Sequence, residues 1–262
     1  MKKSGKKVAK KTLGSDEKQI VPEKSDILQK PFISFEEVWK SYKMASGDVH
    51  ALQGLTFQIN EGEFVVIVGP SGAGKTTLLN LLGGMDRATS GTLRVGGDDL
   101  LHFNEAKLTR YRRDMVGFVF QFYNLMPNLT ALENIELAVE IRKNSLKPAE
   151  VLEQVGLTER AKNFPSQLSG GEQQRVSIAR SVAKNSKIIL CDEPTGALDY
   201  QTGKKILKLL HDICRIHNRT VVLVTHNSAL KEMADKVITI KNGQAESVEI
   251  NENPKPIEEI NW

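Results

Sequence analysis

Cysteine is scarce in this sequence, with two residues in a chain of 262. Cys191 and Cys214 both lie in apolar surroundings, and their spacing matches neither a disulfide framework nor a metal site. The scarcity argues against a small secreted fold stapled by disulfides. We therefore expect two small, buried side chains in a protein of a reducing compartment.

Long apolar runs are also absent. No stretch comes near the roughly 20 apolar residues that a membrane-spanning helix needs, and the lysine-rich start lacks the apolar segment of a secretory signal. These absences argue against a transmembrane or secreted protein. With 40% hydrophobic and 26% charged residues, the composition predicts a soluble globular protein of one or two compact domains in the cytosol.

The formal net charge is +4, and much of it comes from six lysines within the first eleven residues. Few core-forming residues accompany them, so we expect residues 1–30 to be a disordered lysine-rich tail. Such a tail could lie against an anionic membrane surface or a nucleic acid, but a solvated tail is the simpler interpretation. We expect no nucleic-acid partner.

From Pro31 onward the apolar pattern predicts an α/β fold. Short β-rich runs dominate the start, and after Thr76 helical patterns alternate with short apolar runs. Such runs between helices are typical of strands buried on both faces of a parallel sheet. The expected strands cover residues 32–42, 49–53, 55–59, 64–68, 116–120, 188–192, 221–225 and 237–241.

One long stretch of the chain is predominantly helical. We interpret residues from about 122 to 185 as a helical subdomain inserted into a main domain that spans residues 31–250. A further helix, over about 202–217, carries an apolar stripe. Residues 251–262 are polar and contain two prolines, so we expect a loose tail there. The helices expected in the subdomain lie near 132–141, 148–155 and 158–162.

A glycine-rich stretch lies between an apolar run and a helical pattern. The spacing of Gly69 from Gly74, Lys75 and Thr76 fits a phosphate-binding P-loop, whose backbone N–H groups and helix N-terminus face the anion. Lys75 would reach the β- and γ-phosphates of the bound nucleotide, and the Thr76 hydroxyl would bind Mg²⁺; the loop alone leaves kinases, GTPases, helicases and many others open. A glycine turn without a ligand would not need this lysine. The candidate phosphate-binding residues are Gly69, Pro70, Ser71, Gly72, Ala73, Gly74, Lys75, Thr76 and Thr77.

A second apolar run, residues 187–191, ends in two acidic residues. Carboxylates at the end of a buried strand lie where a metal-bound phosphate binds in an α/β sheet. We expect Asp192 to bind Mg²⁺, directly or through water, and Glu193 to polarise the water that attacks the γ-phosphate. Two acids that serve only solubility are the weaker interpretation beside a P-loop.

A third motif, LSGGEQ at residues 168–173, begins another helix. Locally, Ser169 with Glu172 three residues later forms a capping box. A helix N-terminus with two glycines and a hydroxyl is also an anion-binding surface, which the chain would then have twice. The candidate residues here are Ser169, Gly170, Gly171 and Glu172.

Taken in order, these motifs resemble those of the ATP-binding-cassette (ABC) ATPases, and the resemblance covers nearly all of residues 32–245. It implies a P-loop NTPase fold of the ABC type, with an N-terminal antiparallel β subdomain and an inserted α-helical subdomain. It also implies that two cassettes pair head to tail, as a homodimer or a pseudo-symmetric pair. Each signature helix, which begins at LSGGEQ, then closes over the nucleotide held by the partner's P-loop.

The resemblance assigns roles to four further residues. Gln121 matches the glutamine that senses Mg²⁺ and the attacking water, and His226 matches the histidine that contacts the γ-phosphate. Asp199 matches the loop that crosses the dimer interface. Tyr42 fits the aromatic residue that stacks on adenine, although a packing role for an aromatic at a strand end stays open. The implied magnesium ligands are Thr76, Gln121 and Asp192, and the implied catalytic residues are Lys75, Gln121, Glu193 and His226.

Several stretches resemble the lipoprotein-release and macrolide-export subfamily, which includes the cell-division cassette. They are residues 84–91, 120–125, 163–168 and 192–199. The resemblance implies an ATP-hydrolysing subunit, peripheral on the cytoplasmic face of the cell membrane, that drives a separate integral-membrane permease. The apolar residues 122–130 would form the groove that receives a helix of that permease. The permease would set the substrate and the direction of transport.

Two alternatives belong to other classes. A soluble ABC ATPase acting on a non-membrane partner stays open, although DNA-repair types need a long coiled coil between Lys75 and Asp192, and ribosome-acting types carry two cassettes in one chain. The sequence has neither feature. A lone P-loop kinase or GTPase would have no use for residues 168–173.

Overall fold

The computed structural model describes residues 30–45, 47–140 and 142–261. The expected disordered tail, apart from Lys30, lies outside these residues. From Pro31 onward the chain forms one compact unit, and both of its cysteines are buried as expected.

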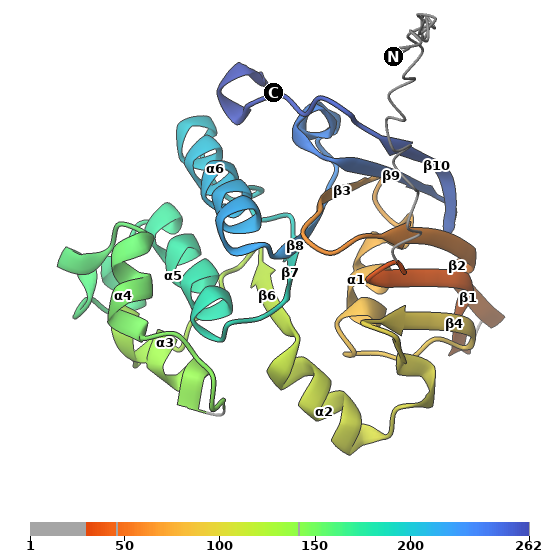
Figure 1. Cartoon of the computed structure of the whole chain (residues 1–262), viewed down its shortest axis with the longest axis horizontal. Helices are drawn as coiled ribbons and strands as arrows, with labels where there is room; N and C mark the ends of the chain where they lie inside the picture. Colours follow the sequence, from red (N-terminus) through yellow and green to blue (C-terminus); the bar gives the residue numbers. More distant parts are fainter. Residues whose placement is uncertain (1–29, 46, 141, 262) are drawn as a thin grey trace, which may run out of the picture. The chain divides into compact units, whose positions relative to one another are not determined.

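The central sheet has six strands in the order β10-β9-β3-β8-β7-β6 (Figure 1). Five of them run parallel, and β10 pairs antiparallel with β9 at the edge. The inner strands β3 and β8 are buried along their whole length, as their continuous apolar sequences predict. The strands are β3 (Phe64–Val68), β6 (Val116–Phe120), β7 (Ile188–Asp192), β8 (Thr220–Thr225), β9 (Lys236–Lys241) and β10 (Gln244–Ile250).

A second, antiparallel sheet has the order β2-β1-β4-β5. We expected separate strands at 49–53 and 55–59, but β2 is continuous. Gly54 lies inside it with φ of +65°, where the pairing with β1 shifts register. The glycine therefore marks an irregularity within one strand and not its end. The strands are β1 (Ile33–Met44), β2 (Gly47–Ile59), β4 (Ser90–Val95) and β5 (Asp98–Asp99).

Helices cover the central sheet, and α3, α4 and α5, which lie between β6 and β7 in the chain, fall in the stretch where we expected an inserted helical subdomain. The α-helices are α1 (Lys75–Leu82), α2 (Glu105–Asp114), α3 (Ala131–Glu140), α4 (Pro148–Gln154), α5 (Gly170–Ala183) and α6 (Tyr200–His217). The 3-10 turns are η1 (Leu100–His102), η2 (Thr158–Arg160), η3 (Pro165–Gln167), η4 (Ser228–Met233) and η5 (Ile257–Glu259). The helix expected near 158–162 is thus only a 3-10 turn. Across the described ranges, no helix has both the length and the apolar character to cross a bilayer.

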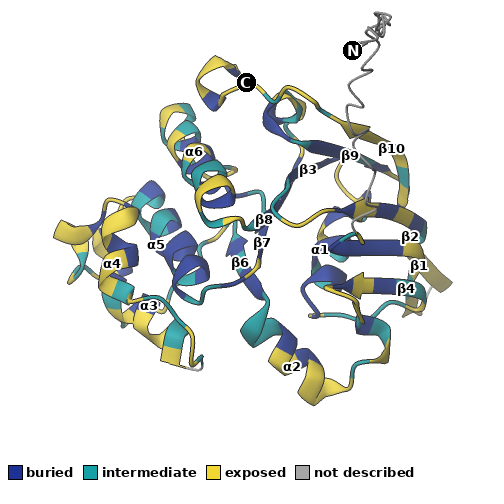
Figure 2. Ribbon diagram, viewed as in Figure 1, coloured by how far each residue is buried: buried dark blue, intermediate teal, exposed yellow. Residues whose placement is uncertain are grey.

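Two hydrophobic cores lie on opposite faces of the central sheet. Figure 2 colours the buried positions of the strands and of the helices beside them dark blue. β3 divides its side chains between them: Phe64, Val66 and Val68 enter one core, whereas Val65 and Ile67 enter the other. The first core also contains side chains of α3 to α6, and the second contains α1 and the antiparallel sheet. Because each fully buried aliphatic side chain contributes about 1.5–3 kcal/mol, α1 and α5 are held firmly on opposite faces.

One buried amide fixes the segment that follows β6. Asn134 on α3 is 1% exposed. Its Oδ1 accepts from the N–H of Met126, and its Nδ2 donates to the carbonyl oxygens of Met126, Leu129 and Thr130. A buried side-chain amide is stable only when it is bonded in this way, so the segment keeps one path over α3.

The C-terminal segment is not the loose polar tail that we expected. Ile257 and Ile260 are 6% and 1% exposed and belong to the same core as the apolar face of α6. Lys204 and Lys208 on α6 bond to the backbone and the carboxylate of Glu258. Two isoleucines three residues apart attach the segment, although its other residues are polar.

The two isoleucines provide a direct test of this attachment. Ile260→Ala should lower the free energy of unfolding by about 2–4 kcal/mol, because it empties a buried site. The control is Ile250→Ala, since Ile250 is 75% exposed on β10 and its loss should cost no more than about 0.5 kcal/mol. Urea denaturation of both variants measures the difference, and equal stabilities would mean that the tail is loose in solution.

Candidate active site

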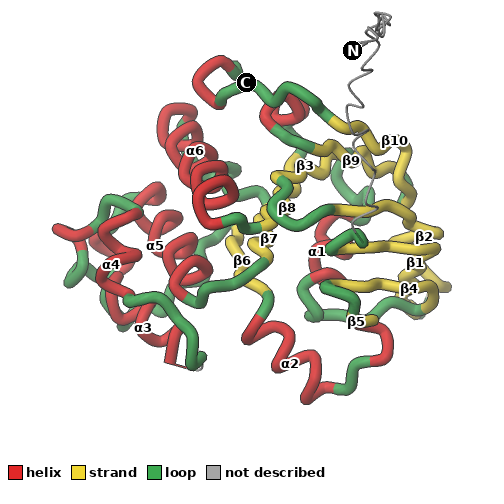
Figure 3. Tube along the Cα trace, in the orientation of Figure 1, coloured by secondary structure: helices red, strands yellow, loops and turns green. Residues whose placement is uncertain are grey.

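The residues predicted to handle ATP lie at the carboxyl ends of four neighbouring strands. β3 leads into the glycine-rich loop and β6 into Gln121, while Asp192 ends β7 and His226 follows β8. Because β3, β8, β7 and β6 are adjacent and parallel, these ends meet at one edge of the sheet. Figure 3 draws the loops that leave these strands in green.

The glycine-rich loop holds its own lysine. The Lys75 ammonium donates to the carbonyl oxygens of Gly69 and Pro70 at 2.8 and 2.9 Å, and the residue is 8% exposed. An ammonium has three N–H groups, so a third is left for a phosphate oxygen. The first turn of α1 has neither a side-chain cap nor an acidic residue, which leaves its positive end suited to an anion.

At two positions of the loop, neighbouring backbone atoms leave no room for a side chain, so only glycine fits. Gly74 precedes α1 with φ of +102°, and a Cβ there would overlap the carbonyl oxygen of Ala51. A Cβ on Gly69 would overlap the carbonyl oxygen of Ile240. The backbone of the loop therefore packs directly on β2 and β9, and larger residues would push it out of position.

An oxygen pair lies beside the start of α1. The Thr76 hydroxyl donates to Oδ2 of Asp192 at 3.2 Å. Burial raises the pKa of Asp192 above its ordinary value, against the opposing hydrogen bond from Thr76. A nearby cation would favour its ionised form. A hydroxyl and a half-buried carboxylate fit Mg²⁺, which binds through one or two protein oxygens together with phosphates and water.

The third residue predicted to bind magnesium, Gln121, lies close by. A Cβ built on Gly196 would be 3.0 Å from Nε2 of Gln121, so this side chain packs against the loop after Glu193. Within the described part of the chain, no group of three or more His, Cys, Asp and Glu side chains forms a metal site. Thr76, Asp192 and Gln121 are the residues that could hold Mg²⁺ together with the phosphates, and a bound ion would neutralise charge on the transferred group.

Glu193 is held from two sides. Its Oε1 accepts from Nδ1 of His226 at 2.9 Å, and its Oε2 accepts from the Thr225 hydroxyl at 3.3 Å. The backbone of Glu193 has φ of +48°, in the left-handed region that costs a non-glycine residue about 1–2 kcal/mol. The local structure thus maintains an unfavourable backbone conformation while both carboxylate oxygens are bonded.

The signature helix begins with the capping box that the sequence predicted. The Ser169 hydroxyl accepts from the N–H of Glu172, and the Glu172 carboxylate accepts from the N–H of Ser169 at 2.8 Å. This backbone hydrogen bond holds the pKa of Glu172 below its usual range, and Arg160 adds an ion pair at 3.0 Å. Glu172 therefore has a capping role, and its contact with nucleotide stays a prediction.

The remaining predicted residues lie on nearby elements. Asp199 accepts from the N–H of Thr202 and caps α6. Hydrogen bonds from the side chain and then the backbone of Thr202 lower the pKa of Asp199. A Cβ on Gly171 would overlap the Thr202 side chain, so the starts of α5 and α6 pack together. Tyr42 lies on β1 and donates from its hydroxyl to Asp86.

The structure separates the two predicted phosphate sites. α1 contributes to the core on one face of the central sheet and α5 to the core on the other. Figure 1 shows the strands between these two helices. Each chain therefore presents a P-loop and a signature motif as two distinct surfaces.

Two residues were not identified from the sequence, but in the structure they hold predicted site residues and segments in place. Thr225 orients Glu193, and its only sequence signal is a polar residue at the end of a buried strand. Arg180 on α5 donates to the carbonyl oxygens of Tyr123 and Asn124, both at 2.7 Å. Both of these residues have positive φ and follow Gln121. No sequence pattern connects Arg180 with a loop nearly 60 residues earlier.

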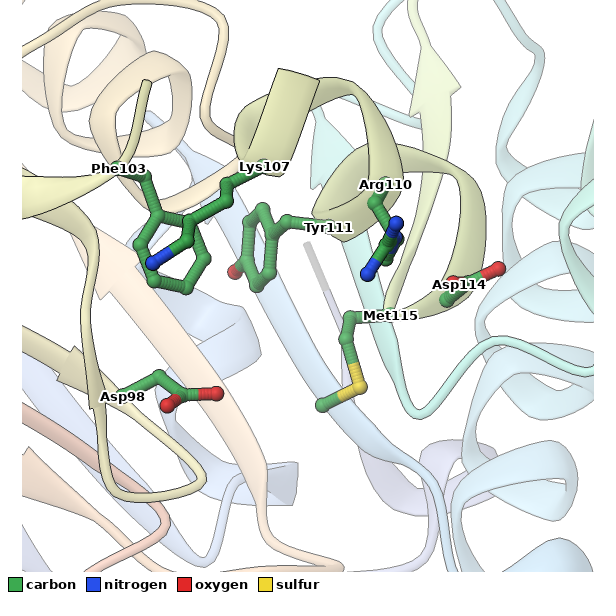
Figure 4. A pocket seen from close by; sticks show the side chains of 7 residues that line it. All are labelled: Asp98, Phe103, Lys107, Arg110, Tyr111, Asp114 and Met115. Carbon is green, nitrogen blue, oxygen red and sulfur yellow. The ribbon is translucent and has the colours of Figure 1, made fainter. Parts of the chain in front are cut away.

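A separate hollow lies away from this edge of the sheet. It has a volume of about 370 Å³ and lies mainly against α2 (Figure 4). Met115, in its lining, directly precedes β6, whereas Gln121 directly follows it. The hollow is therefore near the amino end of β6 and is not part of the nucleotide site. Its lining residues are Asp98, Phe103, Lys107, Arg110, Tyr111, Asp114 and Met115.

Comparison with known proteins identifies the family. Residues 52–196 match the family model described as ABC transporter. A putative ABC transporter ATP-binding protein of Mycoplasma pneumoniae is 45% identical over 214 residues, which are 80% of this chain and 46% of that protein. The macrolide export ATP-binding/permease protein MacB of Escherichia coli is 42% identical over 236 residues, or 88% of this chain and 36% of that protein. The chain thus spans less than half the length of these relatives.

Solved structures give the same result. The ATP-binding cassette MJ0796, in a dimeric post-hydrolysis state bound to ADP and Pi, has a TM-score of 0.76 and 41% identity. The match covers 83% of this chain and 98% of that one. CbiO1 from Clostridium perfringens, part of an ABC transporter complex, has a TM-score of 0.73 and 25% identity over 84% of this chain and 88% of its own. The fold, the order of the motifs and these matches agree: the chain belongs to the ABC transporter family, as one of its ATP-binding cassettes.

Proposed function

We propose that two cassettes hydrolyse ATP at sites shared between them, and that this cycle drives a separate integral-membrane permease. The observation that carries the proposal is the separation of the P-loop and the signature helix onto opposite faces of one central sheet. A head-to-tail pair brings the signature helix of one cassette to the P-loop of the other. The related cassette MJ0796 is dimeric in a post-hydrolysis state bound to ADP and Pi, which is in keeping with a paired form.

Each half of such a site supplies a different part of the chemistry. In the P-loop half, Lys75 and the N–H groups that begin α1 bind the phosphates, and Gln121 orients the attacking water. Glu193 accepts the proton of that water, and His226, already bonded to Glu193, contacts the γ-phosphate. Ser169, Gly170 and Gly171 of the partner add donors to the transferred phosphate. Their loss costs about 3–4 kcal/mol of transition-state stabilisation if they act like an oxyanion hole.

ATP in this scheme joins two cassettes, and hydrolysis releases them. The paired and separated forms are the two states that a permease can distinguish. We place the chain on the cytoplasmic face of the cell membrane, bound to that permease, with no nucleic-acid partner. The names of its relatives, an ABC transporter ATP-binding protein and an ATP-binding/permease protein, favour this class over a soluble ABC ATPase.

An exposed apolar surface suits the permease contact. Phe122 is 77% exposed and Met126 is 50% exposed in the segment after Gln121, and Leu137 on α3 is 51% exposed. An apolar surface of this kind accepts one side of an amphipathic helix. Because Gln121 directly precedes Phe122, the same segment would connect permease position to the attacking water.

The shared site predicts the behaviour of one isosteric variant. Glu193→Gln keeps an oxygen acceptor for His226 but cannot take a proton from water, so ATP turnover should fall at least about 100-fold. Because bound ATP is not consumed, a dimer should accumulate. Size-exclusion chromatography with and without ATP measures it, and a variant that stays monomeric with ATP would count against the shared site.

The loop lysine predicts a separate effect on binding. Lys75→Ala should raise the Kd for a fluorescent ATP analogue about 10-fold or more, because a charge-assisted contact to phosphate is lost. Lys187→Ala, an exposed lysine before β7, is the matched control and should bind as the native chain does. Unchanged binding by the Lys75 variant would remove the P-loop assignment.

The apolar surface predicts where the partner binds. With the full chain expressed in its own cells, Phe122→Asp should abolish co-purification with membranes and leave the Kd for ATP unchanged, since a charge on this surface opposes apolar contact. Ile250→Asp is the control, because Ile250 is 75% exposed on the distant edge strand β10. Recovery of the Phe122 variant with membranes at the native level would contradict the proposed surface.

A further inference from the structure

Tyr42 is held by two residues that no part of the proposed reaction uses. Its hydroxyl donates to Oδ2 of Asp86 at 2.8 Å, and the Lys40 ammonium donates to Oδ1 of the same carboxylate at 2.6 Å. Lys40 also donates to the carbonyl oxygen of Arg87 at 2.9 Å. Both oxygens of one carboxylate thus fix a tyrosine and a lysine that lie two residues apart on β1.

Lys40 also covers one face of the tyrosine ring. Its Nζ lies 4.6 Å from the centre of the Tyr42 ring, a cation–π contact. The side chain of Lys40 is only 11% exposed, whereas Tyr42 as a residue is 36% exposed. A nucleobase cannot share the face that the ammonium occupies. A base that stacks on Tyr42 must therefore use the opposite face.

The carboxylate itself is attached to the helix that follows the P-loop. The backbone N–H groups of Met85 and Asp86 both donate to the carbonyl oxygen of Asn80 on α1, at 2.8 and 3.2 Å. The N–H of Arg87 donates to Oδ1 of Asp86 at 2.7 Å. α1 begins at Lys75, so one rigid helix connects the phosphate-binding residues with the carboxylate that holds the tyrosine.

The protonation states of Asp86 and Tyr42 favour the hydrogen bond between them. Although burial alone would raise it, the hydrogen bonds from Lys40 and Tyr42 hold the pKa of Asp86 below its usual range. Burial and the hydrogen bond to Asp86 raise the pKa of Tyr42. The carboxylate therefore stays ionised and the phenol stays neutral at physiological pH.

We propose that Asp86 and Lys40 are positioning residues for the nucleobase: they fix the Tyr42 ring in angle and distance relative to the P-loop, so that adenine stacks on its one available face. This inference rests on the proposed function, because it takes Tyr42 as the aromatic residue that receives adenine. A ring fixed before the nucleotide arrives loses little conformational freedom on binding, which raises affinity. The pair acts only on nucleotides that carry a base, since inorganic tripolyphosphate contacts the P-loop alone.

Isothermal titration calorimetry with two probes on the full chain separates these contributions. The probes are AMP-PNP, a non-hydrolysable ATP analogue, and inorganic tripolyphosphate. Asp86→Ala should raise the Kd for AMP-PNP about 5-fold, the effect of one lost hydrogen bond, and Lys40→Met about 3-fold, the effect of one lost cation–π contact. Neither variant should change the Kd for tripolyphosphate by more than about 2-fold.

A double-mutant cycle shows whether Asp86 acts through the tyrosine hydroxyl. In a Tyr42→Phe background, which lacks that hydroxyl, Asp86→Ala should raise the Kd for AMP-PNP by no more than about 3-fold further, the part that acts through Lys40. Asp48→Ala is the matched control, because Asp48 is an exposed carboxylate on the neighbouring strand, and it should leave both Kd values unchanged. If Asp86→Ala does not fold, as judged by its Tm, Asp86→Asn serves instead and should give a smaller rise for AMP-PNP alone.

Three outcomes would overturn the inference: an equal loss for both probes, the full loss in the Tyr42→Phe background, or no loss for AMP-PNP. Tyr42→Ala separates this inference from the proposed function. It should raise the Kd for AMP-PNP about 10-fold, as base stacking predicts, and leave tripolyphosphate unchanged. If Tyr42→Ala has that effect and Asp86→Ala has none, only the positioning role falls. If Tyr42→Ala changes neither Kd, the assignment of Tyr42 falls and the positioning role with it.

Discussion

The burial of one parallel sheet on both faces is the constraint on which the rest of the structure depends. Because β3, β6, β7 and β8 are apolar on both sides, they need a layer on each face, and the alternating side chains of β3 show both layers directly. Parallel strands also end at the same edge. The four polar termini therefore meet there, and the site follows from packing that contains no catalytic residue.

The same constraint divides the nucleotide machinery. α1 and α5 each bury an apolar side against the sheet, but on opposite faces, so their N-terminal ends belong to different surfaces of one chain. In the proposed head-to-tail pair, the P-loop of one cassette meets the signature helix of the other, although the fold separates these two elements within one chain. Around the P-loop half, Thr225 bonds the carboxylate of Glu193, and Arg180 bonds the backbone carbonyls of Tyr123 and Asn124. Glu193, Tyr123 and Asn124 all have positive φ, which residues other than glycine rarely adopt. The fold thus makes each half of the proposed site rigid, and the two halves would come together only when two cassettes associate.

Much of this arrangement could be predicted from the sequence, because its signals are local. Short apolar runs located β3, β6, β7 and β8, and the capping box at Ser169 is a four-residue pattern. Neither β4 nor β10 was expected, since strands in which exposed positions interrupt the buried or half-buried ones lack a continuous apolar run. The hydrogen bonds from Arg180 to the carbonyl of Asn124 and from Tyr200 to the carbonyl of Ile260 join residues about 60 positions apart. Such contacts exist only once the fold has formed, so no local sequence pattern predicts them.

The capping box at the signature helix also determines the charge of that surface. A carboxylate bonded at the helix N-terminus cancels part of the positive end of the dipole, and Arg160 beside it restores some positive charge. The positive potential at this turn is therefore lower than at a helix start without a carboxylate, and we expect weaker attraction of dissolved inorganic anions. In the proposed pair, a triphosphate bound to the P-loop of one cassette would not depend on such attraction, because association of the two cassettes would bring it to this turn. Selectivity for a nucleotide held by the partner over dissolved phosphate would then follow from Glu172, a residue that also caps its own helix.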